Sequence, residues 1–488
     1  MTHNNASAHS LQSLGASQGH EQDHKPPLRV LELFAGVGGF HLGLERVNQQ
    51  RISQGLPRAF QLVWANQWEP GSKAQHAARV YEARWGLAPV NRDLFAVLQD
   101  EAELGRLHSL SPDMLVGGFP CQDFSVAKPL SQSQGLEGAK GVLWWGIHRL
   151  LDIRRQAGKP IRMVVLENVD RLLSSPGKCK GRDFATMLSS LQALGYATSW
   201  QVVNGADYGS PQRRRRIFMV AVHESSSDYM RWQHCIDAAP LDWLIGESPL
   251  GQAFPTKAVG ELKHVHVSND VKKVGESFCP TKKGTTPFLK SGVCMGGNVW
   301  TVDVRPHFVC ANGAYAENVT PKTLGQVVAK TVSVAEKFFL DGDALSRWQH
   351  AKGSKSVARV SRSGHAYQFS EGALSFPDPL DKPSRTVLTS EVGASASRTR
   401  HVIAHSDGRL RRLTPEEVEE LMGFSRGFTA LPGISDTRRG FLMGNALLPG
   451  LVARLGQAIL GQMTHAQSEV RDSFPSVGGL DESVIAAG

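Results

Sequence analysis

The sequence predicts an α/β protein whose main domain is a mostly parallel sheet covered on both faces by helices. Between residues 28 and 222, short β-rich runs alternate with helical patterns, and strands separated by helices form parallel sheets. A glycine-rich turn at residues 34–39 follows the first strand, where a nucleotide-like cofactor can approach bare backbone. At 488 residues, the chain is also too long for one ordinary domain.

The expected elements follow one another at short intervals. Strands are expected at residues 28–33, 60–65, 114–116, 161–166, 196–203 and 217–222. Helices are expected from residue 39 to about 47, at 72–85, near 141–156 and at 182–193. From about residue 223 to 410 the alternation is lost, and we expect a separate, irregular domain there. A helix then starts at Thr414, which can form a capping box with Glu417, and a last helix covers about 447–463.

The composition indicates a folded protein with a polyanionic partner. The net charge is +9 and the isoelectric point about 9.3, although a basic surplus alone is weak evidence for nucleic-acid binding. The six cysteines contain no Cys-x-x-Cys pair, so we expect reduced thiols and neither a disulfide framework nor a zinc site. We expect a cytoplasmic protein, because no apolar run is long enough for a membrane span and the N-terminus lacks the apolar core of a signal peptide.

Cys121 is the first candidate for a catalytic group. It follows Gly117, Gly118 and Pro120 in a turn that comes directly after the apolar run 113–116. The loops at the carboxyl ends of such strands collect ligands and catalytic groups, so a thiol there is a candidate nucleophile. Taken alone, a cysteine is more often a small buried apolar residue, and the other motifs of the chain must decide between the two.

Other polar and aromatic residues lie next to the strands in the same way. Trp68 can stack on a purine or fill the core, and Asp93 can accept a hydrogen bond from an exocyclic amine or cap a helix. Glu167 can donate a proton to a substrate or simply pair with an arginine. Arginines two apart in the run 213–216 point to one face of a strand and suit phosphate or carboxylate contacts, unless they are merely solvated.

These motifs occur together in one order, and the ordered set resembles the DNA (cytosine-5)-methyltransferases, the bacterial modification enzymes. The resemblance covers residues 28–222 and 410–460 and leaves 223–375 matched by position alone, as a variable target-recognition region. It rests on the motifs Phe34-Ala35-Gly36-x-Gly38-Gly39, Pro120-Cys121-Gln122, Glu167-Asn168-Val169, Gln212-x-Arg214-x-Arg216 and Gly444-Asn445.

The resemblance implies a Rossmann-like fold that depends on S-adenosylmethionine, with an inserted, irregular target-recognition domain. The polar composition of residues 1–26, without an apolar period, predicts a disordered leader. The catalytic domain would cover 27–225 and be completed by residues 436–465. Residues 226–435 would form the target-recognition domain and 466–488 a flexible tail. Duplex DNA would lie in the cleft between the two domains.

The resemblance also implies roles for the motif residues. Cys121 would attack carbon 6 of a cytosine flipped out of the duplex, and Pro120 would shape its loop. Glu167 would contact ring nitrogen 3, and Arg214 would hydrogen-bond the carbonyl oxygen of the base. Arg216 would contact the backbone of the flipped nucleotide and brace the catalytic loop. No metal would be needed, and residues 124–143 would form a mobile loop that closes over DNA.

The cofactor positions carry one departure from the family. Where the family commonly has a glutamate that binds the ribose hydroxyls, this chain has Gln67. Glutamine loses the charge-assisted strength of that hydrogen bond, so we expect weaker cofactor binding, which Glu69 would offset if the turn lets it reach. The positions that match the family's S-adenosylmethionine contacts are Phe34, Gly36, Gly38, Gln67, Trp68, Asp93, Leu94, Leu143 and Asn445.

The implied partner is double-stranded DNA, and a cognate restriction endonuclease acting on the same sequence would fit a modification enzyme. We expect a monomer that does not bind membranes. Two alternatives remain: methyl transfer to tRNA and a DNA-binding protein with an inactive core. A nicotinamide-dependent dehydrogenase is discounted, because its third glycine is lacking and Pro120 and Cys121 would have no role. The target sequence is not readable, although some side chains look available for DNA contacts: Arg385, Thr386, Thr389, Arg398 and Arg400.

Overall fold

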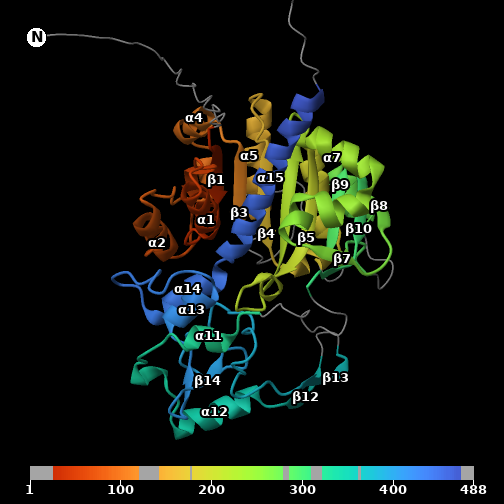
Figure 1. Ribbon diagram of the computed structural model, residues 1–488. Helices are drawn as coiled ribbons and strands as arrows, with labels where there is room; N and C mark the ends of the chain where they lie inside the picture. The colour runs from red at the N-terminus through yellow and green to blue at the C-terminus, as the bar shows by residue number, and fades with distance from the viewer. Residues whose placement is uncertain are drawn as a thin grey trace, which may run out of the picture.

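The computed structural model describes residues 26–119, 142–175, 179–277, 285–308, 321–360 and 364–473. Its centre is a nine-stranded sheet with the order β2-β1-β3-β4-β6-β5-β9-β10-β8 among the described residues (Figure 1). The strands are β1 (Leu28–Leu33), β2 (Phe60–Asn66), β3 (Met114–Gly118), β4 (Met163–Asn168), β5 (Tyr196–Asn204), β6 (Arg215–His223), β8 (Lys263–His266), β9 (Ser291–Met295) and β10 (Asn298–Val302).

Fewer than half of the strand pairings in this sheet are parallel. Strands β2, β1, β3 and β4 are parallel neighbours, whereas all pairings from β4 through β6, β5, β9 and β10 to β8 are antiparallel. The prediction of a mostly parallel sheet is therefore wrong for the second half. Residues 205–214 join β5 to β6, and such a connection is shorter than the dozen or more residues that a parallel crossover needs.

Helices cover both faces of the sheet, as predicted. Along β1, Val30 packs on one face while Leu31 and Leu33 pack on the other, all fully buried, which is the period-two alternation of a strand covered on both sides. The first face is covered by α1 (Gly39–Ser53), α7 (Ser227–Ala238), η4 (Trp243–Glu247), α9 (Pro249–Ala253) and α15 (Pro449–Ser473). The second face is covered by α3 (Leu94–Val97), α4 (Glu101–Leu110), α5 (Val142–Gln156), α6 (Arg182–Ala193) and α10 (Val271–Ser277).

Most predicted elements are confirmed to within a few residues, and the differences have local causes. Helix α2 (His76–Trp85) starts four residues later than predicted, and α15 continues to Ser473. Helices α3 and α4 were not predicted, although Asp93 and Asp100 cap them through their carboxylates. None of the helices in the described ranges is both long and apolar enough to cross a membrane.

The expectation of a separate, irregular domain from about residue 223 is wrong for the segment up to residue 302. Strands β8, β9 and β10 extend the main sheet past the predicted boundary at residue 225, and β9 pairs directly with β5. Gly292 lets β9 lie close to β5, because any Cβ at this position would clash with Trp200, at 2.2 Å from its Cζ2. The three strands have only four or five residues each, so their sequence alternation is too short to recognise.

A smaller domain lies below the sheet in the view of Figure 1. It contains two hairpins, of which β12–β13 extends sideways from α12 as an arm (Figure 1). Thr414 and Glu417 form the predicted capping box at the start of α13. The elements are α11 (Leu324–Val328), α12 (Gly342–Lys352), β12 (Lys355–Val360), β13 (Ala366–Glu371), β14 (Val402–Ala404), β15 (Leu410–Arg412), α13 (Pro415–Leu421) and α14 (Asp436–Asn445).

Helix α15, the last of the described helices, lies beside α1, the first. Helix α15 packs along α1, and Gly43 permits the close approach, since a Cβ at that position would lie 2.4 Å from Cβ of Val452. The side of α1 that faces α15 and the sheet carries Phe40, Leu44 and Val47, all buried. The sheet thus receives part of its cover from a segment that follows the small domain in the chain.

Candidate functional site

The carboxyl ends of β1, β2, β3 and β4 meet at one edge of the sheet, next to the small domain. Because β6 is antiparallel to β4, its first residues lie at the same edge. In open α/β sheets this is the edge at which ligands bind. The structure therefore brings the predicted residues at these strand ends to one edge, namely Phe34, Gly36, Gln67, Trp68, Glu167, Arg214 and Arg216.

Glu167 and Arg216 form the charged pair of this edge. Glu167 lies inside β4, not after it as predicted, and is 8% exposed. Nε of Arg216 lies 2.9 Å from Oε1 of Glu167, but the N–H does not point at that oxygen, which keeps its capacity to accept a hydrogen bond. A carboxyl group beside a guanidinium can hold a polar heterocycle by hydrogen bonds.

Asn168 links this pair to the segment that carries the predicted nucleophile. Its Nδ2 donates to the carbonyl oxygen of Phe119 at 3.0 Å, and both groups are buried. Gly118 faces Glu167, because a Cβ there would lie 3.5 Å from Oε2 of that carboxyl. Pro120 and Cys121, like the expected mobile loop up to residue 141, lie outside the described residues. The structure thus places the residue before Pro120 directly beside the Glu167 strand.

Arg214 is engaged elsewhere, so its predicted contact with the base does not fit this structure. The side chain is 2% exposed; Nη1 donates to the carbonyl oxygen of Val387 at 3.0 Å, and Nη2 donates to those of Gly444 and Ala446 at 2.9 and 2.8 Å. Burial, helped by the charge of Arg216, lowers the pKa of Arg214 to about 9. The side chain fastens the sheet to the small domain and to the end of α14.

Replacing Arg214 with alanine is expected to destabilise the protein by about 3–5 kcal/mol, because three buried carbonyl groups lose their donor. The measurement is the midpoint of urea unfolding. The matched control is Arg213→Ala, since Arg213 is exposed and its backbone N–H keeps its bond to Ser384; its effect is expected within about 0.5 kcal/mol. Equal midpoints for the two variants would contradict the structural role.

The glycine-rich turn leaves open space beside β1. Gly36 has a φ of +55°, and nothing lies within 4 Å of the position that a Cβ would take. Gly38 serves packing instead, since a Cβ there would lie 2.2 Å from Nε1 of Trp85. The backbone N–H of Gly36 donates to Oε1 of Gln67 at 2.7 Å. Gln67 therefore holds the turn in place, a role that the sequence analysis did not foresee.

Trp68 and Asp93 retain groups that a ligand can use. The indole of Trp68 is 40% exposed. Asp93 is a helix cap, the less specific of its two predicted roles, and accepts from Phe95 and Ala96 through Oδ1 alone. Its Oδ2 makes no hydrogen bond among the residues that the structure covers. Asn66, which the sequence analysis overlooked, fixes this loop by donating to the carbonyl oxygen of Arg92 at 2.9 Å.

The remaining predicted cofactor residues are placed as follows. Leu94 is buried at 2% exposure, so only its backbone can meet a ligand. Leu143 is half-buried in the first turn of α5, and Asn445 is exposed at the end of α14. Glu69 does not reach this space, since it pairs with Arg438 and accepts from the N–H of Ala77 at 3.2 Å. The expected compensation for Gln67 is therefore not supported.

A buried carboxyl group under the glycine-rich turn was also missed. Glu32, inside β1, accepts from the hydroxyl of Tyr81 at 2.9 Å and from the backbone N–H groups of Phe40 and His41. Burial raises the pKa of Glu32 to about 8. It satisfies N–H groups in the first turn of α1, which otherwise have no partner within the helix. The only feature of the sequence that pointed to this role of Glu32 was an acidic residue inside an otherwise apolar strand.

Comparisons with known proteins identify the family of this chain. The family model described as C-5 cytosine-specific DNA methylase matches residues 28–461. The chain is 39% identical over 438 residues to the Type II methyltransferase M.Sau3AI of Staphylococcus aureus, covering 88% of this chain and 95% of that protein. It is 30% identical over 193 residues to the Type II methyltransferase M.HhaI of Haemophilus parahaemolyticus, covering 40% and 48% of the two chains.

Solved structures match the fold at low sequence identity. The crystal structure of the S. pombe Dnmt2 methyltransferase aligns with a TM-score of 0.52 and 13% identity, covering 90% of this chain and 99% of that one. The Entamoeba histolytica methyltransferase EhMeth gives a TM-score of 0.51 at 13% identity. These matches show a methyltransferase fold of the Rossmann-like type. With the family model spanning most of the sequence, the chain belongs to the C-5 cytosine-specific DNA methylase family.

Proposed function

We propose that this DNA cytosine-5 methyltransferase acts on cytosine within a specific duplex sequence, as the modification enzyme of a restriction-modification system. The observation that carries the proposal is the pair of Glu167 and Arg216 beside the strand end that leads to Cys121. The similarity to two Type II methyltransferases supports the link to restriction-modification. A cognate endonuclease would recognise the same sequence.

In the proposed reaction, the thiolate of Cys121 adds to carbon 6 of a flipped cytosine, which makes carbon 5 electron-rich. Glu167 hydrogen-bonds ring nitrogen 3 and draws electron density from the ring. We now assign the contact with the base carbonyl to Arg216 rather than Arg214, because Arg216 lies beside Glu167 while Arg214 is used internally. After carbon 5 is methylated, its proton leaves and the bond to Cys121 breaks.

The residues at the open ends of β1 and β2 fit the proposed cofactor. S-adenosylmethionine, when bound, supplies an electrophilic methyl group. The exposed indole of Trp68 offers a stacking surface for its adenine, and the free Oδ2 of Asp93 can accept from an exocyclic amine. The open space at Gly36 admits a ligand close to the backbone. The other proposed contacts are Phe34, Gly38, Gln67, Leu94, Leu143 and Asn445.

Replacing Gln67 with glutamate is expected to tighten binding of S-adenosylmethionine about five- to tenfold. A carboxylate can keep the bond from Gly36 through one oxygen and offer the second to a ribose hydroxyl, as a stronger, charged acceptor. The measurement is titration calorimetry with the cofactor alone. Gln61→Glu, an exposed position at the other end of β2, adds the same charge and should bind like the wild type. Weaker binding by Gln67→Glu would refute this placement of the ribose.

The proposed function is tested by offering duplex DNA and tRNA with labelled S-adenosylmethionine. We expect label in the DNA, and 5-methylcytosine after digestion to nucleosides. Sequencing of the modified cytosines would then give the recognised site. Label in tRNA but not in duplex DNA would contradict the proposed substrate, and no label in either would favour a DNA-binding protein with an inactive core.

A further inference from the structure

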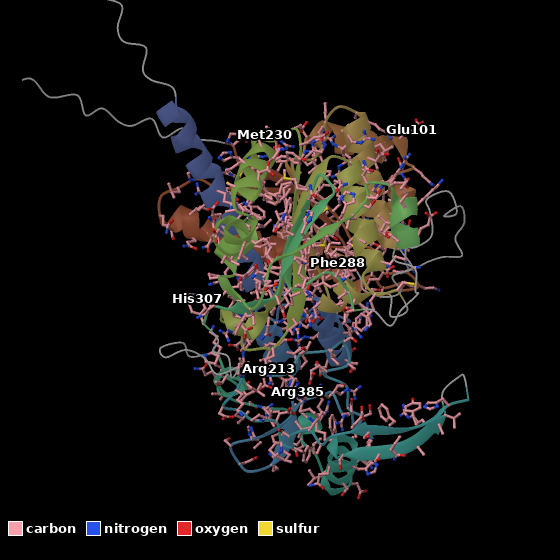
Figure 2. The ribbon with its side chains drawn as sticks, turned by 90° about the vertical axis from the view of Figure 1, so that its right-hand side faces the viewer. Glu101, Arg213, Met230, Phe288, His307 and Arg385 are labelled. Carbon is pink, nitrogen blue, oxygen red and sulfur yellow. The ribbon has the colours of Figure 1, made fainter. Side chains whose placement is uncertain are left out.

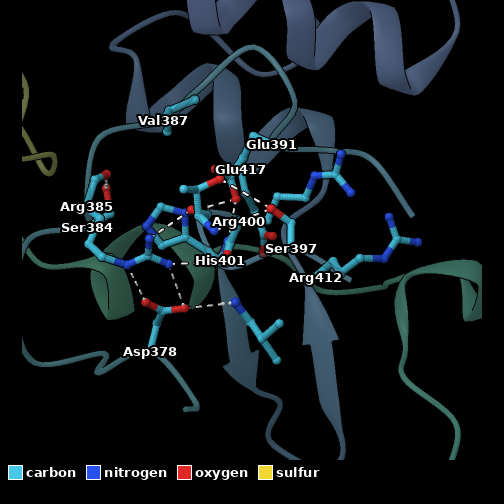
Figure 3. A network of polar contacts seen from close by, with 12 residues as sticks. Asp378, Ser384, Arg385, Val387, Glu391, Ser397, Arg400, His401, Arg412 and Glu417 are labelled. Carbon is cyan, nitrogen blue, oxygen red and sulfur yellow. Dashed lines mark hydrogen bonds and ion pairs between the residues drawn. The ribbon is translucent and has the colours of Figure 1, made fainter. Parts of the chain in front are cut away.

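Four of the five side chains that looked available for DNA contacts, those of Arg385, Thr386, Arg398 and Arg400, already make hydrogen bonds within the protein. Arg385 donates from Nε to Oδ1 of Asp378 at 2.8 Å (Figure 3), and from Nη2 to the carbonyl oxygen of Arg400 at 3.1 Å. Thr386 donates its hydroxyl to the carbonyl oxygen of Arg213 at 2.6 Å. These side chains stabilise the domain and its junction with the sheet, so the surface that reads DNA must be sought elsewhere.

The β12–β13 hairpin is such a surface, because most of its side chains face solvent. Val357, Val360 and Tyr367 are exposed although apolar, and Val360 keeps 69% of its surface. An isolated two-stranded hairpin is marginally stable in water, and exposed apolar groups gathered on one element mark an interaction site. The hairpin therefore has the character of a surface that a partner covers.

The two faces of the hairpin differ. On one face Lys355 pairs with Glu371, Val357 with Phe369 and Arg359 with Tyr367, and the guanidinium of Arg359 lies 3.8 Å from the centre of the Phe369 ring. The only partly buried residues of the two strands, Lys355, Phe369 and Glu371, all belong to this face. The opposite face, which we call the small face, is fully exposed and consists of Ser356, Ala358, Val360, Ala366, Gln368 and Ser370.

The small face suits the edges of base pairs. Its short side chains let the backbone come close, and a two-stranded ribbon fits the major groove, which is about 12 Å wide. Gln368 is its longest polar side chain, and Nε2 donates to Oγ of Ser356 at 2.7 Å. That bond orients the amide and leaves its oxygen and second N–H for a partner. Glutamine can form two hydrogen bonds with one base in the groove.

The base of the hairpin is held by charged side chains, one half-buried and two buried. Arg398 donates to the carbonyl oxygen of Gly353 at 2.9 Å and also to that of Gly372, the residues just outside the two strands. Lys352, at the end of α12, pairs with Asp378 at 2.8 Å, and both side chains are buried. These contacts fix the direction of the arm, which has no core of its own. A fixed arm loses little conformational entropy when it binds.

The hairpin and the residues just before it carry mostly basic side chains, which favour a polyanionic partner. Residues 344–370 contain five lysines and arginines and no aspartate or glutamate, although Lys352 is buried against Asp378 and the next residue, Glu371, faces Lys355 across the hairpin. Such a segment attracts a phosphate backbone and releases counterions when it binds.

We propose that the small face of the β12–β13 hairpin docks into the major groove of the substrate duplex, where Gln368 reads a base edge and the cations of the other face reach the phosphates. This inference rests on the proposed function, because it requires a DNA substrate with a preferred sequence.

The test uses the full-length enzyme and a duplex library with a randomised central stretch. Gln368→Ala is expected to reduce discrimination at one position of the methylated sequence about tenfold while leaving the other positions unchanged. Ala358→Glu places a carboxylate on the small face and is expected to weaken binding of the library at least about tenfold. The matched control is Ala102→Glu in α4, which lies at the end of the molecule opposite Arg385 (Figure 2). It should bind like the wild type.

All three positions are exposed, so melting temperature and S-adenosylmethionine affinity should stay at wild-type values. If Ala358→Glu binds as tightly as Ala102→Glu, the small face is not the docking face. If Gln368→Ala keeps every preference while Ala358→Glu loses binding, the face touches DNA without reading it. Either result overturns the proposal. A wild-type enzyme that methylates no sequence contradicts the proposed function instead, and the binding measurement, which needs no methyl transfer, still tests the hairpin.

Discussion

Replacing Cys121 with serine is expected to abolish methyl transfer and leave binding of duplex DNA unchanged. A serine hydroxyl is a far weaker nucleophile than a cysteine thiolate at neutral pH, and removing a catalytic nucleophile costs on the order of 10⁴-fold or more in rate. The rate is measured with labelled S-adenosylmethionine, and DNA binding is measured separately by fluorescence anisotropy.

The same variant decides whether a covalent adduct forms. DNA that carries 5-fluorocytosine cannot lose a proton from carbon 5, so the bond to the nucleophile should persist and be visible on a denaturing gel. The wild type should give this adduct and Cys121→Ser should not. Cys235→Ser, at a partly buried thiol of α7, is the matched control and should behave like the wild type. Unchanged turnover by Cys121→Ser would make the covalent route untenable.

Glu167→Gln is expected to slow methyl transfer about 100- to 10,000-fold. This is the usual contribution of a general acid or base that transfers a proton in the transition state. The amide can still hydrogen-bond the ring but cannot exchange a proton with it. Single-turnover rates measure the effect, and the dissociation constant of S-adenosylmethionine should stay at the wild-type value. A collapse of cofactor binding would show that Glu167 belongs to the cofactor site.

The stability of the Glu167→Gln variant has to be measured together with its rate. Glu167 is the carboxylate beside Arg216, so its replacement leaves a partly buried guanidinium without its counter-charge. The urea midpoint therefore has to be compared with that of the wild type before the rate is interpreted. A loss of rate with an unchanged midpoint assigns the effect to the chemistry.

The sequence was sufficient for the parallel half of the sheet and for the residues at its carboxyl edge. Strand β1 and helix α6 have the predicted bounds, because each has an unbroken apolar pattern and a clear boundary. Trp68 lies just after β2 as predicted, and Glu167 lies at the predicted edge although inside β4 rather than after it. These features depend on local patterns, which a single sequence contains.

The internal engagement of Arg214 was not predictable in this way. Two arginines two apart share a face only if both lie in one strand, and β6 starts at Arg215. Arg214 lies before the strand and meets carbonyl groups from residues far along the chain. The short strands β8–β10 were missed for a similar reason, since distant pairing stabilises them rather than their own pattern.

The contact between α1 and α15 has a consequence for the synthesis of the enzyme. Phe40, Leu44 and Val47 have no complete cover until the ribosome has delivered residues 449 onward. Roughly 400 residues separate the two helices, which at 5–20 residues per second corresponds to roughly 20–80 s of translation. An unfinished polypeptide therefore leaves this apolar side of α1 uncovered, and we expect the catalytic domain to finish folding only after translation has passed the last helix.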